Sequence, residues 1–357
     1  MSKMTIPKKP LGRNGPLLPP IGFGAMGLGY QSTSVVPISD EDRLAVLDRA
    51  HSIGCTFWDT SDYYGDAEAL IGKWFTRSNK RSEIFIATKF GAIPHADGSF
   101  TFRGDAAYVR EACNNSLTKF GIDTIDLLYP HRLDGSTPVE EIISELVKLK
   151  TEGKIKHIGL SEVSPTTLRR AYAIHPIACV QMEYSAFSTD VEKPVRPPAD
   201  DPNAKEESLI SVCRELGVAI VCYSPMSRGM LTGTITNPDN FDERDYRRNF
   251  PRFSAENFGK NLEVVEVFKR VAERKGESVT AGQVALAWLL AQGGDIFPIP
   301  GTTKTKYVEE NFAALQITLT PDEEAEIRSL VDKASVAGDR YPAEMALGLF
   351  SDTPLPK

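Results

Sequence analysis

The sequence predicts an α/β fold, a closed (β/α)8 TIM barrel with an N-terminal β-hairpin and long loops at its C-terminal face. Eight short apolar runs, most of them rich in β-branched residues, alternate along the chain with segments of helical periodicity. A chain of 357 residues is long enough for one large barrel. Because no shift in composition marks a second unit, we expect a single domain over residues 1–357.

The strands are expected where short apolar runs meet turn residues. Strands of a parallel barrel are buried on both faces, so near-continuous hydrophobic runs are their signature. Helical segments separate the runs, which makes the strands parallel, and eight parallel strands favour a closed barrel over an open sheet. The runs cover residues 21–25, 56–59, 84–89, 125–131, 155–161, 178–183, 218–224 and 296–300.

Helices are expected where apolar residues recur at a spacing of three and four. Ser39 or Asp40 can cap the first of them, and Gly121 suits the end of the third. The helical segments cover residues 40–53, 67–76, 105–120, 138–150, 166–174, 207–216, 262–274, 280–291, 306–315 and 322–333.

Three further segments frame the barrel. Asn14-Gly15, just before the first strand, predicts a type I′ turn and hence a hairpin that covers one barrel end. Residues 188–205 and 226–260 exceed the usual loop length, and loops that long are often functional. Both follow strand ends, so we expect them at the C-terminal face, where barrel enzymes carry their active sites.

Bulk composition excludes several classes of function. The net charge of −7 argues against nucleic acid or an anionic membrane as a partner. The five cysteines show no CxxC spacing, so we expect reduced, buried thiols and no metal site. The basic N-terminus lacks the apolar core of a signal peptide, and the longest apolar run, 284–291, is too short to cross a bilayer. These features favour a cytoplasmic protein.

One motif is misleading. Residues 22–27, Gly-Phe-Gly-Ala-Met-Gly, match the GxGxxG pattern of dinucleotide-binding folds. That pattern requires a preceding strand and a following helix, but Pro19-Pro20 interrupts the strand and residues 29–37 are polar and β-branched. We interpret the glycines as part of a barrel strand end instead.

Four ionisable residues end or follow three consecutive strands. Asp59 ends the second predicted strand, Tyr64 lies in the loop after it, and Lys89 and His131 end the next two. Each residue alone is more often structural, as a turn carboxylate, a core aromatic or a solvated strand end. Because the ends of parallel barrel strands meet at one face, the joint pattern favours a catalytic site.

This combination suits proton transfer to a carbonyl group. A tyrosine has an unperturbed pKa near ~10, so Tyr64 needs help to exchange a proton near neutrality. The ammonium of Lys89 can stabilise the phenolate, and Asp59 can hold the ammonium in place. His131 can polarise a substrate carbonyl or share in the proton transfer.

The segment Gly54-Cys55-Thr56-Phe57-Trp58-Asp59-Thr60-Ser61, followed by Tyr64, Gly65 and Glu68, resembles the first signature of the aldo-keto reductases. These are NADPH-dependent enzymes on a TIM barrel, and the resemblance extends from about residue 11 to 315. It implies that Asp59, Tyr64, Lys89 and His131 form the catalytic tetrad. Tyr64 is then the general acid, and the hydride comes directly from the nicotinamide.

The resemblance also implies where the cofactor binds. Ser161 and Gln181 hold the nicotinamide carboxamide with Glu162, which stands where the family more often has Asn, and Tyr223 stacks on the nicotinamide ring. The loop that begins at Arg228 folds over the pyrophosphate, and Lys304 favours a 2′-phosphate and hence NADPH. The implied contacts are Ala25, Met26, Asp59, Ser161, Glu162, Gln181, Tyr223, Ser224, Pro225, Met226, Arg228, Gly301, Thr302, Thr303, Lys304, Glu310 and Asn311.

The form Gly301-Thr302-Thr303-Lys304 is similar to the bacterial, plant and fungal branch that includes pyridoxal reductases. We therefore expect an NADP-dependent reductase that converts an aldehyde or ketone to an alcohol, with a small carbonyl compound as its substrate. One alternative is an NADPH-binding regulatory subunit with negligible turnover, as in potassium-channel β-subunits. Another is a Schiff-base aldolase that uses Lys89. No motif indicates an oligomeric state.

Overall fold

Eight parallel strands form one sheet in a computed structural model, which describes residues 6–29, 38–95, 99–198, 205–243, 245–334, 336–346 and 348–356. Each strand pairs with the next one of the sheet along the chain. In that order they are β3 (Phe23–Gly24), β4 (Phe57–Asp59), β5 (Phe85–Phe90), β8 (Ile125–Pro130), β9 (Ile155–Ser161), β10 (Cys179–Glu183), β13 (Ala219–Tyr223) and β14 (Ile296–Pro298).

The sheet closes between its first and last strands. Gly24 and Gly301 form a parallel bridge, and the backbone N–H groups of Gly22 and Gly24 donate to Pro298 and Pro300 at 3.0 and 3.2 Å. A Cβ on Gly24 would lie 2.7 Å from the carbonyl oxygen of Ile299. The first and last strands are therefore so close here that only a residue without a side chain fits between them. The predicted (β/α)8 barrel is confirmed.

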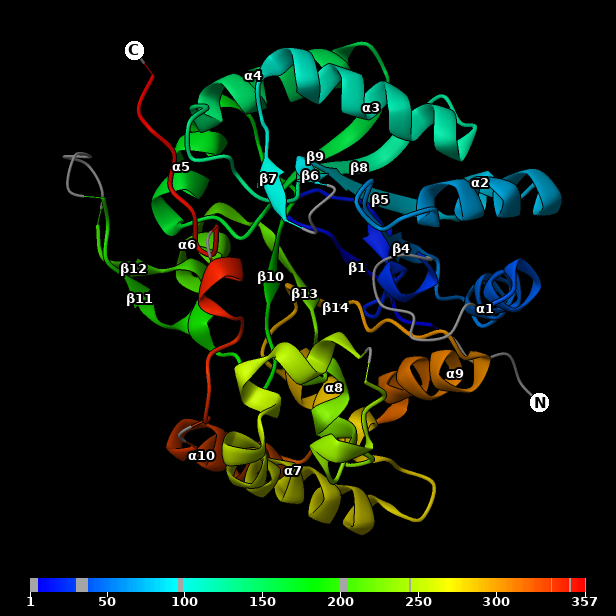
Figure 1. Ribbon diagram of the computed structural model, residues 1–357, viewed down its shortest axis with the longest axis vertical. Coiled ribbons are helices and arrows are strands. Elements are labelled where there is room, and N and C mark those ends of the chain that lie inside the picture. Colours follow the sequence, from blue (N-terminus) through cyan, green and yellow to red (C-terminus); the bar gives the residue numbers. More distant parts are fainter. Residues whose placement is uncertain are drawn as a thin grey trace.

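Helices surround the strands, and in Figure 1 the colour passes around this ring from blue α1 through green α5 to orange α9. The ring closes where Arg49 of α1 pairs with Glu309 of α9 at 2.7 Å. The helices are α1 (Asp40–Ser52), α2 (Ala67–Ser78), α3 (Ala106–Phe120), α4 (Val139–Thr151), α5 (Pro165–Ile174), α6 (Leu209–Leu216), α7 (Ala255–Lys275), α8 (Ala281–Ala291), α9 (Thr305–Ala313) and α10 (Pro321–Lys333).

Local chemistry explains the helix ends. The Ser39 hydroxyl accepts a hydrogen bond from Asp42 N at the start of α1, and Asp105 does the same for Tyr108 N at the start of α3. Gly121 ends α3 with φ +64°, a conformation that glycine adopts without strain.

Side chains that alternate along the strands form two separate hydrophobic cores. Successive side chains of a strand point to opposite faces. One set of buried residues, including Phe57, Leu127, Cys179 and Phe297, fills the barrel interior. Their neighbours at even positions, such as Trp58, Leu128, Val180 and Ile296, belong to the larger core beneath the helices. In β5, β10 and β13 the odd-numbered apolar residues therefore point into the barrel.

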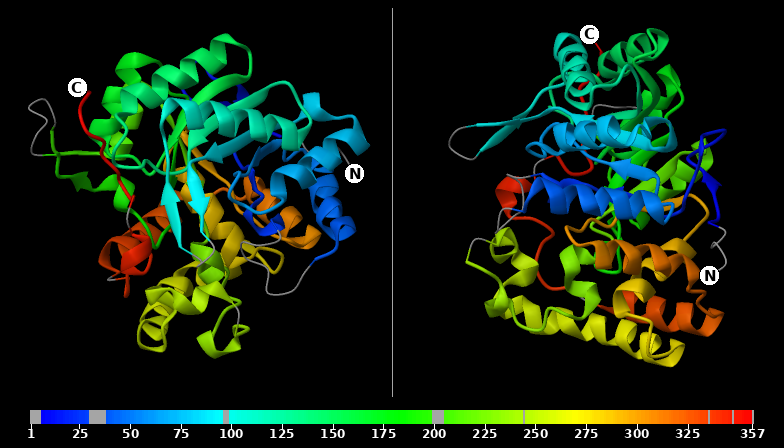
Figure 2. Two further views of the ribbon diagram at one scale, coloured as in Figure 1. Left: turned by 45° about the horizontal axis from the view of Figure 1, so that its top comes forward. Right: turned by 90° about the vertical axis from the view of Figure 1, so that its right-hand side faces the viewer.

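The two barrel ends differ. Strands β1 (Lys9–Pro10) and β2 (Leu17–Leu18) form the predicted hairpin, and Leu11 and Leu18 cover the interior core. Figure 2 shows this hairpin at one end and the hairpin of β6 (Ala92–Pro94) and β7 (Phe100–Phe102) at the other, beside the segment that follows α10. That second end is the C-terminal face, since the strands end there.

Three local predictions are wrong. The N-terminal turn is not type I′, because Asn14 has a positive φ of 60° but Gly15 does not. Residues 207 and 208 form strand β12, paired with β11 (Pro194–Val195), rather than the start of a helix; Ser208 caps α6. Helix α7 begins at Ala255, inside the stretch expected to be irregular up to residue 260.

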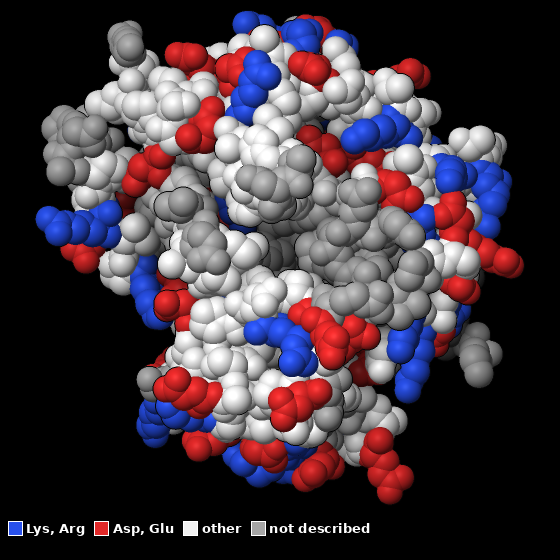
Figure 3. All heavy atoms as spheres, in the orientation of Figure 1, with Lys and Arg blue, Asp and Glu red and all other residues white. Residues whose placement is uncertain are grey.

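The remaining features concern thiols, membranes and surface charge. All five cysteines are buried and free. No helix in the described ranges is long and apolar enough to cross a membrane, and within them no three His, Cys, Asp or Glu side chains are placed to hold a metal ion. On the face shown in Figure 3, acidic and basic side chains are interspersed around the rim.

Candidate active site

The four predicted catalytic residues meet at the C-terminal end of three neighbouring strands. Asp59 is the last residue of β4, Lys89 is next to last in β5, and His131 directly follows β8. Parallel pairing of β4 with β5 and of β5 with β8 brings these ends side by side. Tyr64 joins them from the loop between β4 and α2.

A buried ion pair joins Lys89 and Asp59. Lys89 Nζ lies 2.5 Å from Asp59 Oδ1 and donates to the carbonyl oxygen of Thr60 at 2.8 Å, and neither charged side chain is more than 2% exposed. Asp59 Oδ2 accepts from Tyr129 OH at 2.9 Å and from Gln181 Nε2 at 2.8 Å. Both carboxylate oxygens therefore have partners, as a stable buried ion pair requires.

The aromatic groups stand beside this pair. Lys89 Nζ lies 5.1 Å from the centre of the Tyr64 ring, and the rings of Tyr64 and His131 pack edge to face with centres 5.6 Å apart. His131 Nδ1 lies 3.1 Å from Ser61 Oγ, which fixes the imidazole by one edge. The phenol and the imidazole are thus held against each other next to an ammonium.

Burial sets the protonation states of these groups. It raises the pKa of Tyr64 above its ordinary 10.0, and the Lys89 ammonium only partly offsets this. Burial also lowers the pKa of His131 well below 6.5, and Lys89 and Arg132 lower it further. Burial lowers the pKa of Lys89 too, but Asp59 and Tyr64 outweigh that effect and leave it raised. Near neutrality the site holds a phenol, a neutral imidazole and an ammonium.

The residues expected around the nicotinamide lie together beside this set. Ser161, Glu162 and Gln181 are at most 2% exposed. Ser161 ends β9 and Glu162 follows it, Gln181 is the middle residue of β10, and Tyr223 ends β13. The Tyr223 hydroxyl donates to Glu162 Oε1 at 2.8 Å, and Gln181 is bonded to Asp59. This group is therefore continuous with the catalytic one.

Arg132 links the two groups. It follows His131 and is half-buried. Its Nη1 atom donates to Ser161 Oγ at 3.2 Å, and its guanidinium lies 5.8 Å from the centre of the Tyr223 ring. The positive charge of Arg132 lowers the pKa of Tyr64, after the larger effects of burial and of its nearer neighbours.

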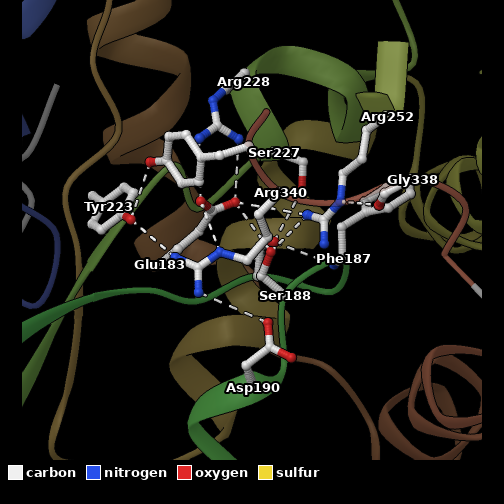
Figure 4. A network of polar contacts seen from close by, with 12 residues as sticks. Glu183, Phe187, Ser188, Asp190, Tyr223, Ser227, Arg228, Arg252, Gly338 and Arg340 are labelled. Carbon is white, nitrogen blue, oxygen red and sulfur yellow. Dashed lines mark hydrogen bonds and ion pairs between the residues drawn. The ribbon is translucent and has the colours of Figure 1, made fainter. Parts of the chain in front are cut away.

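Arg228, expected over the pyrophosphate, is engaged with the protein. Its Nη2 atom lies 3.2 Å from the buried carboxylate of Glu183, and its guanidinium lies 4.6 and 4.8 Å from the rings of Phe250 and Tyr341. Figure 4 shows Glu183 surrounded by Arg228, Arg252 and Arg340. The pKa of Glu183 is lowered, because these three cations outweigh the effect of its burial.

The turn after β13 carries three more of the predicted contacts. Ser224 has a positive φ of 47°, Pro225 is buried, and Met226 packs partly into the core near α8. Ala25 and Met26 follow β3, and Ala25 N donates to the carbonyl oxygen of Asp59 at 2.8 Å.

The residues expected at the adenosine end lie at β14 and α9. Gly301 forms the barrel seam, and Thr302 Oγ1 accepts from Lys304 N at 3.1 Å. Thr303 is half-buried, and Lys304 is exposed at the start of α9. On α9, Glu310 accepts a hydrogen bond from Thr280 Oγ1 at 2.8 Å, and Asn311 is buried.

Sequence reasoning missed several residues of the site. Tyr129 holds Asp59 and could have been found, because it lies two residues before His131 and so shares its inward face. Ser61 lies in the signature segment, but the sequence does not show its contact with His131. Arg340, whose Nη2 atom lies 2.9 Å from Glu162 Oε1, follows α10 and carries no local signal.

Comparisons with known proteins agree with this geometry. The model of the Aldo/keto reductase family matches residues 20–332. The aldo-keto reductase str7 of Strobilurus tenacellus is 46% identical over 99% of this chain and 100% of its own length. The aldo-keto reductase yakc [NADP(+)] of Schizosaccharomyces pombe is 46% identical with the same coverage.

Solved structures show the same architecture. A glycerol dehydrogenase from Gluconobacter oxydans superposes with a TM-score of 0.78 at 24% identity, covering 95% of this chain and 98% of that one. A thermostable aldo-keto reductase in complex with the inhibitor epalrestat gives a TM-score of 0.68 at 26% identity, covering 90% and 99%. These structures share the fold of the chain. The family model and the two full-length relatives show that the chain belongs to the aldo/keto reductase family of oxidoreductases.

Proposed function

We propose that this protein reduces an aldehyde or ketone to an alcohol, with NADPH as the hydride donor and Tyr64 as the proton donor. The observation that carries the proposal is the convergence of the Tyr64 phenol, the Lys89–Asp59 ion pair and the His131 imidazole at one end of the barrel. Residues 1–357 act as one domain in this proposal, because the segment after α10 returns to the end of β9.

The residues present fit the cofactor. Glu162 Oε2 is buried without a hydrogen-bond partner in the described ranges, so it offers an acceptor for the amide N–H of a nicotinamide carboxamide. Ser161 and Gln181 lie next to it, and Tyr223 offers a ring surface. Lys304, near the hydroxyls of Thr302 and Thr303, can pair with a 2′-phosphate. The relative from Schizosaccharomyces pombe is named for NADP(+), which supports the same cofactor here.

Each catalytic side chain has a role that its protonation state permits. NADPH supplies a hydride to the carbonyl carbon when it is bound. Tyr64 carries its proton near neutrality and donates it to the carbonyl oxygen. Lys89 stabilises the phenolate left behind, and Asp59 keeps the ammonium in place. When Ser61 donates to His131 Nδ1, the ring proton lies on Nε2, which can bind the carbonyl oxygen.

The aldolase alternative fits the site poorly. A Schiff base forms from a neutral amine, which a lysine attains through a lowered pKa. The pKa of Lys89 is raised, and its ammonium is bonded to Asp59 and to the backbone of Thr60. The group is therefore held as a cation.

Turnover of NADPH with a panel of aromatic and aliphatic aldehydes tests the proposal. We expect sustained loss of absorbance at 340 nm over many turnovers, which a regulatory subunit would not produce. The Tyr64→Phe variant removes the proton donor and should lower kcat about 10²- to 10⁴-fold. Tyr63→Phe, at the neighbouring position, is the matched control and should stay within a few-fold of the wild type. Full activity in Tyr64→Phe with normal NADPH binding would falsify the mechanism.

A further inference from the structure

Glu162 stands in a backbone conformation that a glutamate seldom adopts. Its φ is +51°, in the left-handed region, where Asn, Asp and Gly are the usual residues. Its carboxylate is fully buried at the end of β9. Because both the conformation and the buried charge are costly, a local partner must stabilise this residue.

That partner is Arg340, from the segment that follows α10. Arg340 Nη2 donates to Glu162 Oε1 at 2.9 Å and to the Tyr223 hydroxyl at 3.0 Å, while its Nε atom lies 3.4 Å from Glu183 Oε2. Arg340 is 8% exposed. One buried guanidinium thus reaches residues at the ends of β9, β10 and β13. Figure 4 shows it between Glu183 and Tyr223.

The two carboxylates depend on Arg340 to different degrees. Glu183 also has Arg228 and Arg252 within 4 Å, at 3.2 and 3.8 Å. For Glu162, the described part of the chain supplies one ion-pair partner, Arg340. Removing Arg340 would therefore leave Glu183 neutralised and Glu162 without its counter-ion.

The oxygens of Glu162 divide their contacts unequally. Oε1 accepts from Arg340, from the Tyr223 hydroxyl and, at 3.2 Å, from Glu183 N. Oε2 is buried and accepts from none of the described residues. Buried carboxylate oxygens are normally hydrogen-bonded, so this unpartnered oxygen beside Tyr223 can accept from a donor that a ligand brings.

The segment that carries Arg340 is fixed on both sides. Before it, the Asn261 side chain bonds both backbone groups of Ala337 at 2.9 Å. After it, Ser351 N donates to the carbonyl oxygen of Glu162 at 2.8 Å, and Ser164 N donates to the carbonyl oxygen of Ser351 at 3.0 Å. Arg340 is therefore held in place before any ligand arrives.

We propose that Arg340 is a positioning residue of the cofactor site, which holds the Glu162 carboxylate so that Oε2 accepts a hydrogen bond from the nicotinamide carboxamide. The segment after α10 then takes part in nicotinamide recognition. The Glu162–Arg340 pair replaces the neutral amide side chain of the Asn that the family more often has at this position. This inference rests on NADPH being the cofactor.

Calorimetric binding of two ligands tests the role of Arg340. NADPH contains the nicotinamide, whereas 2′,5′-ADP contains only the adenosine end. Arg340→Met should weaken NADPH binding about 10- to 100-fold, the value of one hydrogen bond to a charged group, and leave 2′,5′-ADP binding unchanged. Arg328→Met, which removes another partly buried arginine from an ion pair with Glu192, is the control and should change neither.

A second substitution separates positioning from general stability. Glu162→Asn removes the charge that needs Arg340, so the double variant Glu162→Asn/Arg340→Met should recover NADPH affinity relative to Arg340→Met alone. If Arg340→Met does not fold, Arg340→Lys is the second variant. It keeps the positive charge but lacks the planar guanidinium that bonds several acceptors at once, so it should weaken the binding of NADPH but not of 2′,5′-ADP.

Three results would overturn the inference. They are unchanged NADPH affinity in Arg340→Met, parallel weakening of both ligands, and a double variant as weak as the single one. If wild-type protein binds 2′,5′-ADP and NADPH equally tightly, the nicotinamide makes no net contribution and the role of Glu162 is wrong. If the wild type binds neither ligand, the proposed cofactor itself is wrong.

Discussion

Tyr129 donates a hydrogen bond to the carboxylate oxygen of Asp59 that Lys89 does not contact. The hydroxyl lies 2.9 Å from Asp59 Oδ2, while Lys89 Nζ lies 2.5 Å from Oδ1. Because Tyr129 is fully buried, this carboxylate is oriented from inside the barrel as well as by its ion pair with Lys89.

Tyr129→Phe should lower the free energy of unfolding by about 1.5–3 kcal/mol, since it deletes a hydrogen bond to a charged group and leaves Gln181 as the other donor to Oδ2. Urea denaturation measures the change. Tyr172→Phe, on α5, removes a hydroxyl that has no hydrogen bond in the described ranges and should change stability little. Equal stability of the two variants would show that Tyr129 does not hold Asp59.

His131 should make the protein less stable in mild acid. Burial, Lys89 and Arg132 lower its pKa in the folded state, whereas the unfolded chain takes up a proton near pH 6.5. The contribution of the neutral imidazole is therefore complete above pH 6.5 and is lost as the pH falls, at up to about 1.4 kcal/mol per pH unit. Comparing unfolding of the wild type and His131→Gln from pH 8 to pH 5 should show a smaller acid loss in the variant. Parallel curves would rule this out.

Gly24→Ala should weaken the barrel seam. The added methyl group would lie 2.7 Å from the carbonyl oxygen of Ile299, which belongs to backbone that cannot move without breaking the closure. We expect a loss of about 1–3 kcal/mol or more in thermal or chemical unfolding. Gly294→Ala is the control, because its Cβ would have no atom within 4 Å. If Gly24→Ala is as stable as Gly294→Ala, the close contact between the first and last strands is wrong.

Lys304→Met should reduce the preference for NADPH over NADH. The exposed ammonium can pair with a 2′-phosphate, which NADH lacks, so KM for NADPH should rise about tenfold or more and KM for NADH should not. Lys306→Met, two residues further along, removes an equally exposed charge and tests for a general electrostatic effect. A similar rise for both cofactors would place Lys304 away from the 2′-phosphate.

The barrel and the convergence of Asp59, Tyr64, Lys89 and His131 could be predicted because their signals are local. Helix α3 was expected at 105–120 and is found at Ala106–Phe120, where Asp105 and Gly121 mark the ends. Lys89 and His131 stand at the ends of apolar runs, and parallel strands bring such ends together. Each of these inferences needs only neighbouring residues and the geometry of one fold.

The predictions that failed concern features set by contacts between residues far apart in the sequence. Helix α7 starts earlier than expected because its first turns contain Gly259 and polar residues, and tertiary packing of Phe258 and Asn261 overrides their weak helical preference. The sequence places Lys89 and Asp59 near Tyr64 but does not show how deeply the phenol is buried, and burial has the larger effect on its pKa. Arg340 meets Glu162 across 178 positions of sequence, which no local pattern encodes.

Because of that long separation, the site is complete only after the segment that follows α10 has been synthesised. When Glu162 leaves the ribosome, the arginine that neutralises it has not been made, nor has Ser351, which pairs with its backbone. A chain that stops before residue 340 therefore carries an uncompensated acid just after the end of β9, and we expect it to be unstable and to bind the nicotinamide poorly. If the proposed role of Glu162 holds, folding and cofactor binding both depend on the segment that contains Arg340 and Ser351.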